Sequence, residues 1–254
     1  MSNWLKIPAN RTFLLLLLLL IAVNVFATLT QNMLLLKWSK PFFIPIFLVY
    51  YFSKNGFVGT FFWIFVLLSF FADSTSVFVE NSVYLKTSSI IYGASYACLV
   101  FMVMQKLRSI HLDKVVGLYL VVVFLINIFF MVKLYDILKF SISDTIELTM
   151  FTIRAVALVA LALVAFVMYL NEDNKQSIMF LMMALSFVFS DVLYYINNYY
   201  IYNWGFVAME RALHVTGLFF LFKYVIEQNR ELKNQLVFQR KQEEAPTASL
   251  LHNY

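Results

Sequence analysis

Long apolar runs follow one another from residue 12 to residue 227, and they lack the alternation of apolar and polar residues that is typical of barrel strands. A lipid bilayer admits only helices and closed barrels, because every backbone polar group needs a partner within the protein. The chain is 62% hydrophobic and only 13% charged, whereas a water-soluble domain has about 25% charged residues. We therefore predict an all-α fold, a polytopic bundle of about eight transmembrane helices.

A helix of about 20 apolar residues crosses the bilayer core. The predicted spans are 12–30, 36–53, 58–80, 87–105, 115–133, 147–170, 176–197 and 207–227. The second is the weakest because Pro41 and Pro45 interrupt its start. The polar stretch from Lys133 to Glu147 is long enough for a re-entrant or surface segment. We expect one transmembrane domain over 1–227, then a charged cytoplasmic tail over 228–254 that extends the last helix and becomes partly disordered.

The first run could be the core of a signal peptide, because Lys6 and Arg11 precede the leucines. No clear small-residue cleavage pattern follows, and "NVFATLTQN" is only a weak candidate. We expect a retained helix.

Lysine and arginine collect on the cytoplasmic side of membrane proteins. With eight spans, both termini lie on one side, and that side holds eleven such residues against five on the other. The eleven are Lys6, Arg11, Lys54, Lys106, Arg108, Lys114, Lys175, Arg230, Lys233, Arg240 and Lys241, and the five are Lys37, Lys40, Lys86, Lys133 and Lys139. We expect a multi-pass protein of a bacterial inner membrane with both termini in the cytoplasm. The net charge of +5 fits this bias and does not indicate a nucleic-acid partner.

Ionisable side chains within the spans lie in the half of the bundle that is remote from the termini. Such groups are costly in lipid, face the bundle interior and mark functional sites. At 1.5 Å rise per residue they lie roughly 10 Å below the outer boundary. The set comprises Asp73, Arg154, Asp191 and His214, with Glu210 and Arg211 one turn above His214, Lys40 entering from the same side, and Tyr92, Ser95, Tyr96 and Asn127 in the same half. This coincidence predicts one polar chamber that opens toward the non-cytoplasmic side.

Structural roles are the alternative for each residue. Asp73 and Asp191 could pair with Arg154 to hold helices together, and Arg154 is either such a counter-ion or a phosphate ligand. His214 could be a packing hydrogen bonder, and Lys40 could extend to the interface. Most of the tyrosines near the end of the seventh span are typical of an interfacial aromatic belt. The belt set is Tyr194, Tyr195, Tyr199, Tyr200, Tyr202 and Trp204.

Several kinds of site are missing from the sequence. It has no GxSxG elbow, no HExxH and no phosphate-binding glycine loop. Cys98 is the only cysteine, so neither an internal disulfide nor a cysteine-based metal site is available. Three scattered histidines do not indicate structural zinc. We expect no metal and no organic cofactor.

Three short motifs occur in order along the chain. Lys40-Pro41 opens the second span, and Ala72-Asp73 lies in the third. The seventh span contains a small-x-x-Phe-x-x-Ser-Asp pattern, formed by Ala184, Phe187, Ser190 and Asp191. Across residues 12–227 this order and spacing resemble the YhhN/lysoplasmalogenase-like integral membrane family. The chain diverges from that family where Ala72 replaces a glycine, where the fourth span lacks a histidine, and where His214 stands in place of a tyrosine with a nearby glutamine.

The resemblance implies hydrolysis of the vinyl ether bond of lysoplasmenylethanolamine or lysoplasmenylcholine, giving a fatty aldehyde and a glycerophospho-alcohol. Asp73 and Asp191 would be catalytic, one donating a proton to carbon and the other stabilising the cation and activating water. Substrate-binding residues would be Lys40, Arg154, Tyr194, His214 and Tyr96. The partners would be the lysophospholipid and membrane lipids.

Three other functions remain open. A non-catalytic receptor or binding protein for a lipid or small amphiphile would keep the chamber but show no turnover, although the tail is short for an output domain. A proton-coupled carrier would use Asp73 and Asp191 as titrating groups and would need access from both sides. An inactive descendant of an enzyme would retain the residues without the reaction.

Overall fold

Every regular element of the described residues is helical, as predicted. The computed structural model describes residues 9–53, 59–78, 82–107, 114–142, 144–172 and 174–250. The elements are α1 (Ala9–Leu29), α2 (Met33–Ser39), the 3₁₀ turn η2 (Lys40–Phe42), α3 (Phe43–Ser53), α4 (Thr60–Phe78), α5 (Ser82–Leu107), α6 (Lys114–Ser141), α7 (Thr145–Asn171), α8 (Lys175–Tyr199) and α9 (Trp204–Leu250). Lys6, Lys54, Arg108, His111 and His252 lie outside the described residues.

Within the described residues, six helical segments are long and apolar enough to cross a membrane, counting Met33–Ser53 as one. Two more, Leu15–Leu29 and Thr60–Thr75, are apolar but shorter. The prediction of membrane helices therefore holds for six segments, and the full count of eight stays a prediction.

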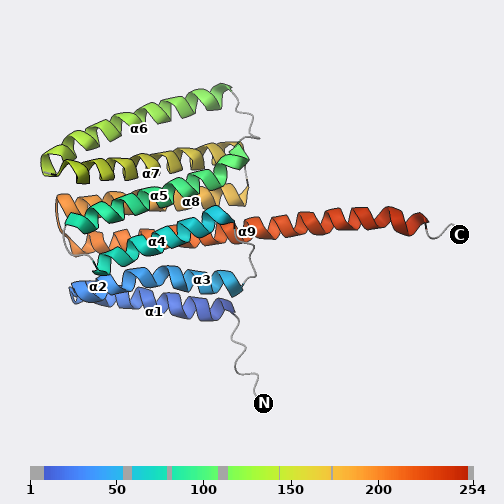
Figure 1. Cartoon of the computed structure of the whole chain (residues 1–254), viewed down its shortest axis with the longest axis horizontal. Helices are drawn as coiled ribbons and strands as arrows, with labels where there is room; N and C mark the ends of the chain where they lie inside the picture. Colours follow the sequence, from blue (N-terminus) through green and yellow to red (C-terminus); the bar gives the residue numbers. More distant parts are fainter. Residues whose placement is uncertain are drawn as a thin grey trace, which may run out of the picture.

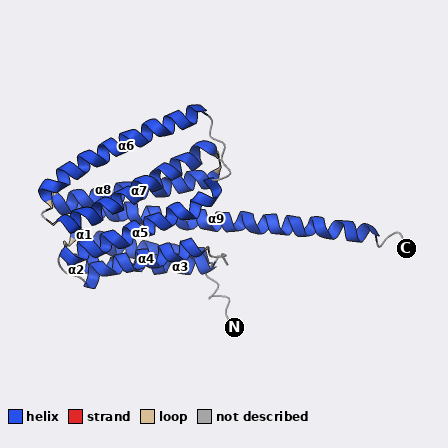
Figure 2. Ribbon diagram, turned by 45° about the horizontal axis from the view of Figure 1, so that its top comes forward, coloured by secondary structure: helices blue, strands red, loops and turns tan. Residues whose placement is uncertain are grey.

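The helices lie side by side in one bundle (Figure 1). α1 begins, and the extension of α9 leaves, at one end, which we call the tail end. α1, α4, α6 and α8 end, and α2, α5, α7 and α9 begin, at the opposite end, the far end. The closest helix pairs are α8 with α9 and α5 with α4 and α7, whereas α6 packs on α7 at the edge of the bundle (Figure 2).

The second predicted span is broken near its middle. The Asn32 side chain accepts a hydrogen bond from the backbone N–H of Leu35, so α2 begins earlier than the sequence indicated. Pro41 has no N–H to continue the helical ladder, and the chain passes through η2 before α3 resumes. This break places Lys40 against the bundle interior.

One prediction about the end of a span differs from the structure. The stretch that begins at Lys133 is not a separate re-entrant segment, because α6 continues to Ser141 and α7 begins at Thr145. Leu138 anchors this extension, since its side chain is fully buried in a cluster with Phe151. α9 continues to Leu250, so the predicted extension of the last helix is present, which agrees with its many Gln, Glu, Lys and Arg residues. The partial disorder of the tail stays a prediction.

Candidate functional site

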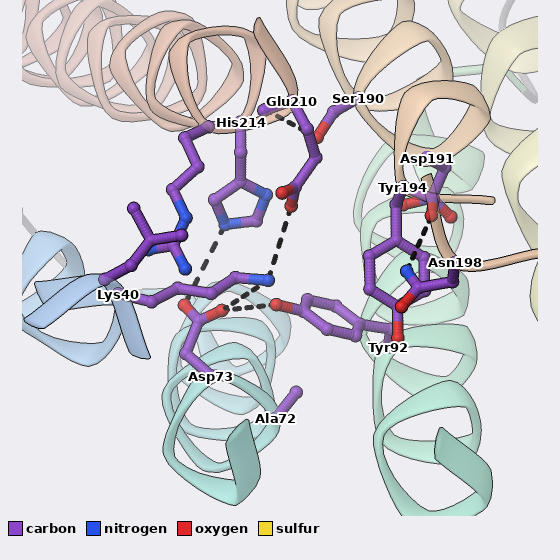
Figure 3. A network of polar contacts seen from close by, with 12 residues as sticks. Lys40, Ala72, Asp73, Tyr92, Ser190, Asp191, Tyr194, Asn198, Glu210 and His214 are labelled. Atoms are coloured by element: carbon purple, nitrogen blue, oxygen red, sulfur yellow. Dashed lines mark hydrogen bonds and ion pairs between the residues drawn. The ribbon is translucent and has the colours of Figure 1, made fainter. Parts of the chain in front are cut away.

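Asp73 is fully buried on α4, and polar side chains from three other elements surround it (Figure 3). The hydroxyl of Tyr92, on α5, donates a hydrogen bond to Asp73 Oδ1. The ammonium of Lys40, in η2, lies 3.7 Å from the same oxygen. Nε2 of His214, on α9, lies 3.8 Å from Oδ2. One carboxylate thus gathers a hydroxyl, a cation and an imidazole.

Lys40 does not extend to the interface, because its side chain lies inside the bundle between two carboxylates. Besides Asp73 it contacts Glu210, whose Oε1 is 3.5 Å from Lys40 Nζ. Glu210 is fixed from the other side, since Ser190 Oγ donates to its backbone carbonyl at 3.0 Å. The contacts link the broken second span to α4, α8 and α9.

Asp191, on α8, forms a second buried acidic centre with Arg154, on α7. Arg154 donates from Nε to Oδ2 at 2.7 Å and from Nη2 to Oδ1 at 2.5 Å. Tyr96 adds a third hydrogen bond to Oδ1, at 3.1 Å. Of the two roles proposed for Arg154, the structure gives that of a counter-ion, and its partner is Asp191 rather than Asp73.

The aromatic ring of Tyr92 joins the two centres. Its centroid lies 4.4 Å from the guanidinium carbon of Arg154, while its hydroxyl reaches Asp73. The rings of Tyr194 and Tyr195 also contact the guanidinium, at 5.1 and 5.5 Å. Cation–π contacts of this kind are strongest where the cation is removed from water. Tyr194 and Tyr195 therefore belong to this network of buried contacts and not to the aromatic belt.

Close helix packing sets the position of these groups. A Cβ on Gly93 of α5 would lie 3.3 Å from the Cα of Arg154, so this glycine lets α7 approach α5 closely. A Cβ on Gly217 of α9 would lie 2.6 Å from the ring of Phe187. That ring in turn lies 5.6 Å from the imidazole of His214 and 5.7 Å from the ring of Tyr96.

The structure brings together every side chain of the predicted site. These are Lys40, Asp73, Tyr96, Arg154, Asp191, Tyr194 and His214, all in or beside the linked contacts above. Tyr92 and Glu210 also belong to the network, although the sequence only placed them at the right depth. Their signal was helical spacing, because Tyr92 is four residues before Tyr96 and Glu210 four before His214.

Asn127 shares the depth of the chamber but lies on α6, at the edge of the bundle. Its side chain donates to the backbone carbonyl of Val123 at 2.8 Å, within its own helix. The structure thus leaves it out of the network. Among the described residues, no group of three or more His, Cys, Asp or Glu side chains is arranged to hold a metal ion.

Comparison of the chain with models of protein families, with curated proteins and with solved structures gives no match.

Proposed function

We propose that this protein is a membrane-embedded hydrolase that cleaves the vinyl ether bond of lysoplasmalogens, as the resemblance to the YhhN/lysoplasmalogenase-like family implies. The observation that carries the proposal is the surroundings of Asp73. A buried carboxyl group lies beside a tyrosine hydroxyl, a lysine and a histidine. This set can deliver a proton to a substrate that is held away from bulk water.

The proposal includes eight membrane crossings with both termini in the cytoplasm. Along the chain, the six membrane-length segments and the two shorter apolar helices run alternately toward the far end and toward the tail end of the bundle. The chamber would then lie in the non-cytoplasmic half. A lysolipid, which has one chain and a polar head group, would enter with its vinyl ether at this depth.

Asp73 would act as both acid and base. Its protonated carboxyl gives a proton to the β carbon of the vinyl ether, and an oxocarbenium ion forms at the carbon bonded to oxygen. Water adds to that carbon, and the Asp73 carboxylate takes the proton that the water releases. The resulting hemiacetal breaks its bond to the glycerol oxygen, giving a fatty aldehyde and a glycerol hydroxyl. Asp73 ends in its starting state, so no other reactant is consumed.

Asp191 has a different role in this mechanism. Both of its oxygens are bound by Arg154, so it holds the guanidinium against the ring of Tyr92 and thereby positions the hydroxyl that reaches Asp73. Lys40 loses one counter-ion when Asp73 is protonated, and we assign it to the substrate phosphate.

The first test is aldehyde release from lysoplasmenylethanolamine and its choline analogue by the protein purified in detergent. We expect release from wild type and from Asp144→Asn, an acid outside the chamber. We expect none from Asp73→Asn that elutes as a monodisperse folded protein. Undiminished release from that variant would remove Asp73 from the reaction. A wild type that releases nothing from a panel of ether and ester lysolipids would exclude hydrolysis of these substrates and leave lipid or amphiphile binding as the function to test.

A further inference from the structure

A pocket of about 220 Å³ lies between α1, α3 and α9, outside the chamber. Its walls are largely apolar, with Ile21 from α1, Phe43 from α3 and Val215 from α9. Asn24 and Arg211 give it one polar region. A pocket of this make-up, between helices that are apolar along their length, fits a ligand with both a hydrocarbon part and a polar part.

Arg211 has fewer partners than the other cations at this depth. Its Nη1 lies 3.4 Å from Oδ1 of Asn24, a neutral amide. Its Nε is buried and makes no hydrogen bond to the described residues. No carboxylate in the described part of the chain forms an ion pair with it, whereas Arg154 has Asp191 and Lys40 has two acids. A cation among apolar helices is costly without an anion beside it.

We infer that the pocket binds a single-chain amphiphile with an anionic oxygen head group, phosphate or carboxylate. The head group would accept hydrogen bonds from the Arg211 guanidinium, and the chain would lie along the apolar walls. The pocket is smaller than the roughly 300–1,000 Å³ that encloses a whole drug-sized ligand, so it has room for part of one chain. The inference rests on the proposed membrane arrangement but not on the proposed hydrolysis.

Asn24 connects this pocket to the chamber. Its Oδ1 accepts a hydrogen bond from Ser39 at 2.9 Å, and Ser39 directly precedes Lys40. Arg211 follows Glu210, which contacts Lys40. An anion on Arg211 would therefore lie one layer of side chains from the network around Asp73.

The test is equilibrium binding of radiolabelled lysophosphatidate to the full-length protein in lipid nanodiscs, measured by scintillation proximity. Arg211→Gln should weaken binding about tenfold or more, the scale of one lost charge-assisted hydrogen bond. Arg211→Lys should retain part of the affinity, because it keeps the charge. Ala212→Phe, which narrows the pocket without touching a charge, should also weaken binding. Lys223→Gln, a cation on the exposed side of the same helix, should bind as wild type.

Competitors separate the possible head groups. The first competitor is an unlabelled fatty acid of the same chain length. If it competes fully, the pocket binds a carboxylate as well as a phosphate. If it does not compete, the pocket binds phosphate. Equal competition by the neutral monoacylglycerol would overturn the role of the anion. Wild-type affinity in both Arg211→Gln and Ala212→Phe would overturn the pocket itself. Because binding is read directly, a protein that binds but releases no aldehyde would contradict only the hydrolase proposal.

Discussion

Arg154 and Asp191 neutralise one another inside the bundle. Both side chains are almost completely buried, and two hydrogen bonds join them. Such a pair adds little to stability relative to well-packed apolar residues, but removal of one partner leaves an uncompensated charge. Replacing either residue alone should therefore destabilise the protein by more than the pair itself contributes to stability.

A double-mutant cycle tests this pair. We expect Arg154→Met or Asp191→Leu alone to lower the free energy of unfolding by about 3–5 kcal/mol. The double variant should lose clearly less than the sum of the two, because no unpaired charge remains. Denaturant titration in detergent micelles measures all three. Lys86→Met, which removes a partly exposed partner of Asp144, should have a smaller effect. Additive losses at 154 and 191 would contradict a direct coupling.

Loss of the Tyr92 hydroxyl should slow aldehyde release more than loss of the Tyr96 hydroxyl. Tyr92→Phe keeps the ring over Arg154 but removes the hydroxyl that bonds Asp73. If Asp73 transfers the proton, this variant should release aldehyde about tenfold more slowly or worse, since a hydrogen bond to a charged group is worth about 1.5–3 kcal/mol. Tyr96→Phe should cost less, because Asp191 keeps both bonds from Arg154. The opposite order would favour Asp191 as the acid.

At the level of helices, close approach explains how side chains from six elements reach one place. Glycines at positions 93 and 217 let α5 approach α7 and let α9 approach α8. Phe187 fills the space at Gly217 and touches His214 and Tyr96, so the packing of α8 on α9 positions groups at both acidic centres.

Gly217→Val should therefore lower the stability of the protein. The added side chain would displace the Phe187 ring, and overpacking of this kind costs about 1–3 kcal/mol. Gly117→Val is the matched control, because Gly117 lies in α6 with open space around its missing Cβ. Thermal unfolding of the two variants in the same detergent gives the comparison. Equal stability would show that α8 and α9 can separate at little cost.

Asp144, at the start of α7, should make the stability of the protein depend on pH. The hydrogen bond from Lys86, on α5, is the main reason that the pKa of Asp144 lies below its ordinary value, and the backbone N–H of Ile146 adds to it. A carboxylate with a lowered pKa in the folded state stabilises that state at neutral pH. This contribution to the free energy of unfolding is lost as the pH falls below the ordinary aspartate pKa of about 4 and through the lower pKa of Asp144 in the folded state.

Asp144→Asn isolates the charge, because asparagine caps a helix as well as aspartate does. We expect wild type to melt at a higher temperature than Asp144→Asn at pH 7, with a difference that shrinks toward about pH 3. A difference that stays constant over this range would exclude the ion pair as its cause.

The sequence predicted the helices well because apolar runs of membrane length have no stable alternative in lipid. It erred where polar residues occur in a continuing helix, as at Lys133, because burial of Leu138 against Phe151 depends on the neighbouring helix. It also could not indicate that Pro41 would turn Lys40 inward and not toward the interface.

For the site, the common depth of the ionisable residues predicted their convergence. Depth alone does not fix pairing, because that depends on how each helix is rotated about its axis. The sequence therefore left open which aspartate pairs with Arg154, and it assigned Tyr195 to the aromatic belt. The rotation of α7 and α8 places Asp191 and Tyr195 against the guanidinium.

The whole molecule has a clear polarity between its two ends. The polar network around Asp73 lies toward the far end, whereas a pocket of about 390 Å³ lies at the tail end. Its lining includes the cations Lys175, Lys223, Arg230 and Lys233 with Glu227. Cations at this end agree with a cytoplasmic location under the positive-inside rule.

Cysteine labelling tests the proposed orientation. In a Cys98→Ala background, Asn203→Cys at the far end should react with a membrane-impermeant maleimide on intact spheroplasts. Asn234→Cys on the extension of α9 should react only after permeabilisation. The reverse pattern would invert the topology, and labelling of both sites from outside would mean that α9 does not cross the membrane.

α9 is a single helix of 47 residues, so it is about 70 Å long, more than twice the roughly 30 Å thickness of a bilayer core. Glu210 and His214 lie near one end of this rod, and the other end extends beyond the bundle (Figure 1). If a helix of this length tilts as one body, its free tip moves farther than the end that lies at His214. The length of α9 therefore means that any change of packing that tilts this helix near His214 would displace its tail-end tip by a larger distance.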